Sequence, residues 1–105
     1  MIRRIQSKIG SGEYEFSLRA TDQSILRRIS TLDIEQAVAS GEIIEDYPGD
    51  KYGPSCLVFG MNANGRPLHI QCTYPDRPIL KFITVYEPDP NEWLEWKYRR
   101  QRESL

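Results

Sequence analysis

The stretch that decides the fold is Gly65-Arg-Pro-Leu-His-Ile-Gln-Cys-Thr-Tyr-Pro-Asp-Arg-Pro-Ile-Leu-Lys-Phe-Ile-Thr-Val-Tyr-Glu-Pro-Asp-Pro90. Over residues 67–74, apolar and polar side chains alternate, which is the period of a strand with one buried face. Over residues 79–86, almost every side chain is apolar, β-branched or aromatic. That composition is typical of a strand covered on both faces or lying centrally in a sheet. The stretch therefore predicts two adjacent strands joined by a short turn.

His69, the only histidine, lies on the polar face of the first of these strands. Imidazole titrates near neutral pH, so this residue is the first candidate for acid–base chemistry. If the two strands pair, Thr84 and Tyr86 are its neighbours. A dyad with Cys72 is excluded, because the two positions differ by an odd number and leave a strand on opposite faces. A purely structural histidine is the alternative that the residues leave open.

Upstream of this pair of strands, the spacing of apolar residues predicts helices over residues 1–9 and 18–29. In the second of these helices, Leu18, Ile25, Leu26 and Ile29 recur at helical intervals. A capping box at residues 30–33 predicts another helix, which Gly41 ends. Residues 14–17 are a short extended lead-in. The N-terminal third is therefore expected to be mainly helical.

Between these helices and the central stretch, residues 42–47 and 55–61 have the character of strands, the first of them at a sheet edge. Residues 62–65 supply the turn of a hairpin into the His69 strand. After the last strand, residues 89–92 carry helix-starting signals, which predict a basic C-terminal helix over about residues 90–102. Trp93 and Trp96 share a stripe on it. The fold class is α+β: N-terminal helices, an antiparallel meander of three to four strands, and a C-terminal helix.

The composition sets limits on the class of protein. A chain of 105 residues with 39% apolar and 28% charged residues is expected to be one globular domain over residues 1–105. It shows neither a membrane-spanning run nor a signal-peptide pattern, so a cytoplasmic location is expected. Cys56 and Cys72 are expected to be buried thiols. Two separated cysteines and one histidine do not make a metal site, and no phosphate-cradling or cofactor motif is present.

The formal net charge of −1 excludes a uniformly basic nucleic-acid-binding protein, but it allows local basic patches. An arginine can bind a phosphate group in a planar, bidentate way. The alternative for every such side chain is an ordinary solvated surface position. The cations considered for phosphate are Arg27, Arg28, Arg66, Arg77 and Lys81.

The chain resembles the family called domain of unknown function 4258 over about residues 14–93, in six short blocks that occur in the family's order. The blocks are Phe16-Ser-Leu-Arg-Ala20, Arg28-Ile-Ser30, Gly41-Glu-Ile-Ile-Glu-Asp-Tyr-Pro48, Tyr52-Gly-Pro-Ser-Cys-Leu57, Gly65-Arg-Pro-Leu-His69 and Ile83-Thr-Val-Tyr-Glu-Pro-Asp-Pro90. The resemblance implies a barnase- and RelE-like fold, shared with RelE-like and BrnT-like toxins of toxin–antitoxin systems. The implied activity is metal-independent cleavage of RNA. The implied partners are RNA and an antitoxin protein, such as a zinc finger of the MqsA type.

On this resemblance, the catalytic residues would be His69, Arg28, Arg66 and Tyr86, and the substrate-binding residues would be Arg19, Arg27, Thr84 and Lys81, with no metal and no cofactor. Arg19 stands where the family normally has histidine, which excludes a two-histidine mechanism. The missing proton-transfer group is then a tyrosine, a carboxylate such as Glu87, or absent. The alternative function is a catalytically inactive protein-interaction module of the same fold. A pocket that gathers the four catalytic residues favours the ribonuclease, and a buried His69 with a backbone partner favours the interaction module.

Overall fold

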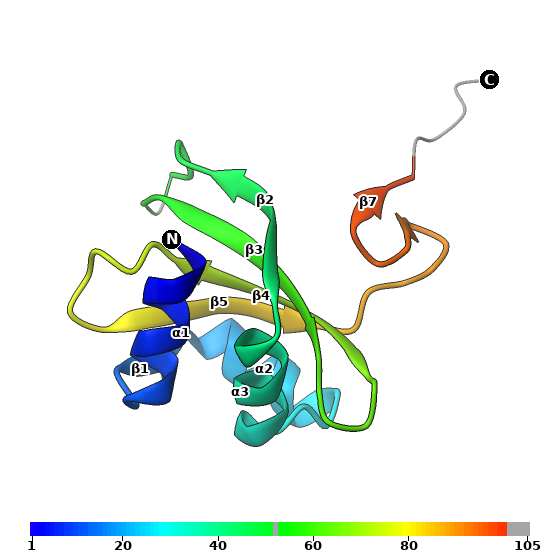
Figure 1. Ribbon diagram of the computed structural model, residues 1–105, viewed down its shortest axis with the longest axis horizontal. Coiled ribbons are helices and arrows are strands. Elements are labelled where there is room, and N and C mark those ends of the chain that lie inside the picture. The colour runs from blue at the N-terminus through cyan, green and yellow to red at the C-terminus, as the bar shows by residue number, and fades with distance from the viewer. Residues whose placement is uncertain (52, 101–105) are drawn as a thin grey trace.

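The structure, a computed structural model, describes residues 1–51 and 53–100. Its main body has two layers, because α1, α2 and α3 all contribute to the core on one face of a five-stranded sheet (Figure 1). The strand order in that sheet is β1-β5-β4-β3-β2. The α+β class expected from the sequence is therefore confirmed.

The three helices are α1 (Ile2–Gly10), α2 (Leu18–Leu26) and α3 (Thr31–Ala39). Ser17 caps α2 by accepting a hydrogen bond from the Ala20 amide. The predicted capping box of α3 is present, with Ser30 and Asp33 each bonding the other's backbone amide. Among the described residues, none of the helices has both the length and the apolar character needed to cross a bilayer.

The predicted meander forms β2 (Glu42–Tyr47), β3 (Ser55–Met61), β4 (Pro67–Thr73) and β5 (Leu80–Tyr86), with each strand antiparallel to the next. The short lead-in is a strand as well: β1 (Tyr14–Phe16) pairs with β5 in parallel. The sheet is therefore mixed rather than purely antiparallel. This is possible because α2, α3 and the meander separate β1 from β5 along the chain, which parallel neighbours require.

The core lies between the helices and the inner face of the sheet. On β4, Leu68, Ile70 and Cys72 point into it, as the alternation predicts. Cys72 lies opposite Cys56 on β3, and both thiols are free and buried, as expected. Residues of the other parity on β3 and β4 project from the face away from the helices, which we call the outer face. On β5 an irregularity between Phe82 and Thr84 shifts the alternation, so that Thr84 and Tyr86 lie on the outer face although Leu80 and Phe82, of the same parity, lie in the core.

The sequence-based expectation of a C-terminal helix over about residues 90–102 is wrong for those residues of the range that the structure describes. Residues 93–94 (β6, Trp93–Leu94) pair with residues 98–99 (β7, Tyr98–Arg99) in a hairpin, orange to red in Figure 1. Asp89 does cap one turn, but Glu95 and Trp96 then take positive φ angles of 53° and 65°. Left-handed residues cannot continue a right-handed helix. Residues 101 and 102 of the expected helix lie outside the described residues.

Candidate functional site

The polar pair at the centre of the outer face is His69 and Tyr86. The register of β4 and β5 sets the two residues directly opposite each other. The Tyr86 hydroxyl lies 3.0 Å from Nδ1 of His69. The sequence-based expectation that Tyr86 is a neighbour of His69 is thus confirmed.

The β6–β7 hairpin covers this pair. His69 has no exposed surface, and the ring of Trp93 packs edge-on against the imidazole at a centroid distance of 4.4 Å. Nε2 of His69 lies 2.6 Å from the Trp96 carbonyl oxygen. A carbonyl can only accept, so Nε2 carries the proton, and Nδ1 of the neutral ring accepts from Tyr86. His69 therefore faces outward from the sheet, as expected, but it is buried and both ring nitrogens are occupied.

Burial also sets the protonation of the pair. Loss of hydration lowers the pKa of His69, while the Trp96 carbonyl and the Glu45 carboxylate oppose that shift. Burial raises the pKa of Tyr86. Both groups are therefore neutral at neutral pH. In this arrangement neither ring nitrogen can exchange a proton with a substrate.

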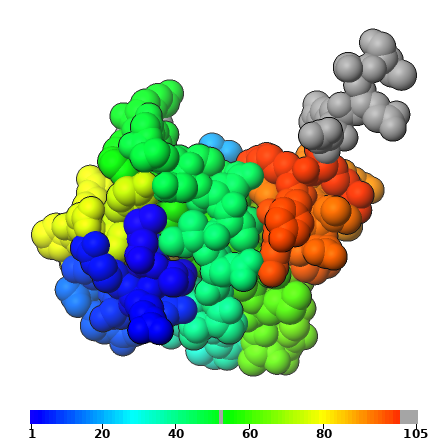
Figure 2. All heavy atoms as spheres, turned by 45° about the horizontal axis from the view of Figure 1, so that its top comes forward, coloured from blue at the N-terminus to red at the C-terminus, as the bar shows by residue number. Residues whose placement is uncertain are grey.

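Two ion pairs join the hairpin to the edge strand β2. Arg99 donates two hydrogen bonds to Glu45, at 2.8 and 3.0 Å, and its guanidinium lies 4.6 Å from the centre of the Trp93 ring. Lys97 lies 3.0 Å from Glu42. Figure 2 shows the hairpin packed against the green surface of the central segment. The region that closes over His69 is therefore attached by aromatic, cation–π and ionic contacts.

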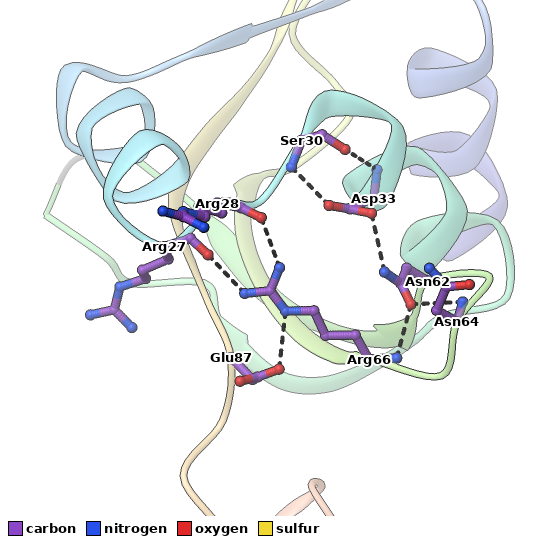
Figure 3. A network of polar contacts seen from close by, with 8 residues as sticks. All are labelled: Arg27, Arg28, Ser30, Asp33, Asn62, Asn64, Arg66 and Glu87. Carbon is purple, nitrogen blue, oxygen red and sulfur yellow. Dashed lines mark hydrogen bonds and ion pairs between the residues drawn. The ribbon is translucent and has the colours of Figure 1, made fainter.

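Arg66 lies apart from the His69–Tyr86 pair and links separate segments of the chain by hydrogen bonds (Figure 3). Its guanidinium donates to the carbonyl oxygens of Arg28 and Arg27, each at 2.8 Å, and its Nε lies 3.0 Å from Glu87. All three nitrogens of the Arg66 guanidinium are therefore hydrogen-bonded to other groups of the protein. Arg28, two residues after the end of α2, has a left-handed φ of 55°, and its carbonyl oxygen points toward Arg66. Figure 3 shows the side chains of Arg27 and Arg28 directed away from Arg66, so the three guanidinium groups do not converge.

The other expected substrate-binding residues divide between two places. Thr84 stays on the outer face beside Gln71, to which its hydroxyl donates at 3.3 Å. Arg19 and Lys81 line one hollow at the far end of that face, and Arg77 lines it too. The structure thus brings together His69 with Tyr86, and Arg19 with Lys81, but it does not gather the four expected catalytic residues in one pocket.

A third feature was not recognised in the sequence as a site. Leu18, Ile25 and Leu26 on α2 are 80%, 73% and 82% exposed. Their helical spacing puts them on one stripe, which we call the α2 ridge. Apolar residues at this spacing normally form the buried face of an amphipathic helix, but here the three side chains are exposed. The signal available in the sequence was that residues 18–26 contain few other apolar side chains, and in the structure only Ala20 of the helix is buried.

Among the described residues, no group of three or more His, Cys, Asp or Glu side chains is arranged to hold a metal ion. The two thiols face each other instead. The hydrogen bond to Cys56 and burial both raise the pKa of Cys72. Cys72 is therefore a protonated, buried thiol, as in an ordinary core.

The comparisons with known proteins bear on the main body of the chain. The family described as Domain of unknown function (DUF4258) matches residues 16–87. No curated protein and no solved structure matches the chain. The match includes the His69–Tyr86 pair and ends before the β6–β7 hairpin that covers it. Because the match spans more than half of the sequence, this chain belongs to the DUF4258 family.

Proposed function

We propose that this protein is a protein-interaction module that binds an amphipathic, acidic helix of a partner protein along the α2 ridge. The observation that carries the proposal is the exposure of Leu18, Ile25 and Leu26 on one helical stripe. Burying side chains of this size is worth roughly 1.5–3 kcal/mol each. Large exposed apolar side chains gathered on one side of a domain are typical of an interaction surface.

The charges around the α2 ridge define the partner. Arg19, Arg27 and Arg28 are exposed, and within the described chain their guanidinium groups form no ion pair. Asp22 is the one carboxylate of α2 itself. A partner helix with an apolar stripe flanked by glutamate or aspartate would pack on the ridge and neutralise these arginines. The antitoxin expected from the family resemblance is the first natural partner to test.

The state of His69 supports this proposal over catalysis. Its two nitrogens are bound to Tyr86 and to the Trp96 carbonyl, and its ring has no exposed surface. Arg66, expected to bind phosphate, is bound to two carbonyls and to Glu87. A site for RNA cleavage needs an accessible acid or base and cations at the scissile phosphate.

A binding measurement with two synthetic helical peptides tests the proposal. Both peptides carry the same leucine stripe, flanked by glutamate in one and by lysine in the other. We expect the acidic peptide to bind at least about tenfold more tightly, and Ile25→Glu to abolish that binding. The matched control is Leu94→Glu, which alters an exposed leucine of β6. Equal binding of the two peptides, or equal loss in both variants, would contradict the proposal.

The second candidate function is metal-independent RNA cleavage, which one observation favours: His69 and Tyr86 are 3.0 Å apart on the outer face. Catalysis by this pair would require the β6–β7 hairpin to leave. An RNA degradation assay with Trp93→Ala, which removes the hairpin's main anchor, distinguishes the two functions. A ribonuclease would gain activity in this variant and lose it again when His69→Ala is added. An interaction module would cleave RNA in neither variant.

A further inference from the structure

A hollow at the end of the outer face remote from His69 gathers three cationic side chains. Its volume is about 470 Å³. We call it the basic groove. The residues that line it are Ser17, Arg19, Thr73, Arg77, Lys81 and Ile83, which come from four separate segments of the chain.

The cations of the basic groove are poorly neutralised by the protein. Within the described chain, the side chains of Arg19 and Arg77 take part in no hydrogen bond or ion pair, in contrast to those of Arg66 and Arg99, which bind carboxylates. The Nζ of Lys81 lies 3.6 Å from a Glu15 oxygen, and no carboxylate lines the groove itself. Like charges that share a hollow repel each other, and an anion placed among them would relieve that repulsion.

One hydroxyl of the basic groove is placed to donate to such an anion. Thr73 is buried, and its Oγ1 accepts the Lys81 amide hydrogen at 2.9 Å. Among the described residues, its own hydroxyl hydrogen has no acceptor. A guanidinium binds phosphate oxygens in a bidentate way, and a nearby hydroxyl adds a further donor. The set of donors therefore suits a phosphate group rather than a cation or an apolar ligand.

The size and limits of the basic groove narrow the ligand class. A volume of about 470 Å³ falls within the roughly 300–1,000 Å³ of small-molecule sites and exceeds the need of inorganic phosphate alone. The half-buried Ile83 supplies an apolar wall. Toward Tyr86 the outer face continues with Gln71 and Thr84, which are uncharged, so the cations form a compact cluster rather than a track for a nucleic-acid backbone.

We infer that the basic groove binds the phosphate of a small phosphate monoester, of the size of a sugar phosphate or a mononucleotide. Arg19 and Arg77 would hold the phosphate oxygens, with Lys81 and Thr73 as additional donors. The basic groove shares Arg19 with the surroundings of the α2 ridge, but it differs from the ridge in its ligand and goes beyond the proposed function. No chemical step is assigned to it.

An NMR titration of the isotope-labelled full chain at low ionic strength tests this inference. The probes are ribose 5-phosphate, adenosine 5′-monophosphate, adenosine, inorganic phosphate and an eight-residue oligouridylate. We expect the two monoesters to shift amide signals of residues 17–19, 73, 77 and 81–83, and adenosine to shift none. Arg19→Gln and Arg77→Gln should each weaken monoester binding by about tenfold or more. Arg27→Gln is the matched control, because it alters an exposed arginine about 12 Å of helix rise away from Arg19.

Three results would overturn the inference. The first is the absence of amide shifts up to millimolar monoester. The second is an equal loss of binding in Arg27→Gln, which would mean general attraction of anions. The third is binding of the oligouridylate without the monoesters, which would assign the surface to nucleic acid. Thermal unfolding of each variant is recorded alongside, and Arg77→Lys, which keeps the charge but loses the bidentate fork, should bind with intermediate affinity.

Discussion

The two ends of the outer face are built on the same two strands, yet they differ in what lies over them. At one end, β4 and β5 present His69 and Tyr86 beneath the β6–β7 hairpin. At the other end, the same strands present Thr73 and Lys81 to the basic groove, which remains open to solvent. We refer to these as the covered end and the open end.

The difference shows that the covering segment, more than the strand position, determines the chemistry of a polar residue. His69 and Thr73 share a strand and a face, and the sequence treats them alike. Under the hairpin, the imidazole loses its hydration and its protonation becomes a matter of folding stability. At the open end, the cations keep their hydration and remain available to a ligand.

The largest effect is expected for His69→Ala, which removes a fully buried ring at the covered end. The change leaves a cavity and strips the Trp96 carbonyl of its donor. We expect the free energy of unfolding to fall by about 3 kcal/mol. Urea denaturation measures it. The matched substitution is Gln71→Ala, two residues toward the open end on the same face, for which we expect a loss of about 1 kcal/mol or less. Equal losses of unfolding free energy in the two variants would show that the hairpin does not make the covered end contribute more to stability than the open end.

A smaller effect is expected for Trp93→Ala. We expect the hairpin to detach while the sheet stays folded, so the loss of stability should be about 2 kcal/mol, less than for a core tryptophan. Hydrogen exchange of the Lys97 and Arg100 amides, which close the hairpin, should accelerate by roughly 10- to 100-fold. Tyr98→Ala, at an exposed hairpin aromatic, should change these rates little. Unchanged exchange in Trp93→Ala would mean that other contacts hold the hairpin.

The pH dependence of stability also distinguishes the covered end from the open end, through the pKa of His69. The folded-state pKa of His69 is lowered below its ordinary value of 6.5, chiefly by burial. At a pH between the lowered folded-state pKa and 6.5, the unfolded chain binds a proton that the native chain does not bind. Stability is therefore full above about pH 6.5 and falls as the pH drops below it. The facing charges, Glu45 and Arg99, oppose each other in this shift. Trp93→Ala should move the NMR-measured pKa of His69 back toward 6.5, whereas Gln71→Ala should leave it in place.

Much of the fold could be predicted from the sequence, because local and tertiary signals agree there. The alternation on β4, the capping box of α3 and the turn before β4 all hold. The C-terminal helix fails because its signals are local and cover one turn only. Burial of Trp93 against His69 and the Arg99–Glu45 pair link segments far apart in sequence, and these contacts override the helix-starting residues.

The candidate site was less predictable for the same reason. The assumption that the two adjacent strands pair correctly placed His69 and Tyr86 together. Parity carries no information on what covers a face, so the burial of His69 was not foreseen. Arg66 was expected to bind phosphate because of its type, but the left-handed turn at Arg28 brings two carbonyls to it instead. The exposure of the α2 ridge was also hidden, because a periodic apolar stripe normally predicts a core face.

The smallest effects are expected for the ion pairs at the two ends. Arg99→Gln breaks a bidentate pair with Glu45 and a cation–π contact with Trp93, so we expect a loss of about 0.5–1 kcal/mol that shrinks at high salt. Lys81→Gln breaks a single exposed contact of 3.6 Å with Glu15, for which the expected change is close to zero. Thermal unfolding at low and high salt measures both. A larger loss for Lys81→Gln would mean that the open end, and not the hairpin, carries the stronger electrostatic stabilisation of the outer face.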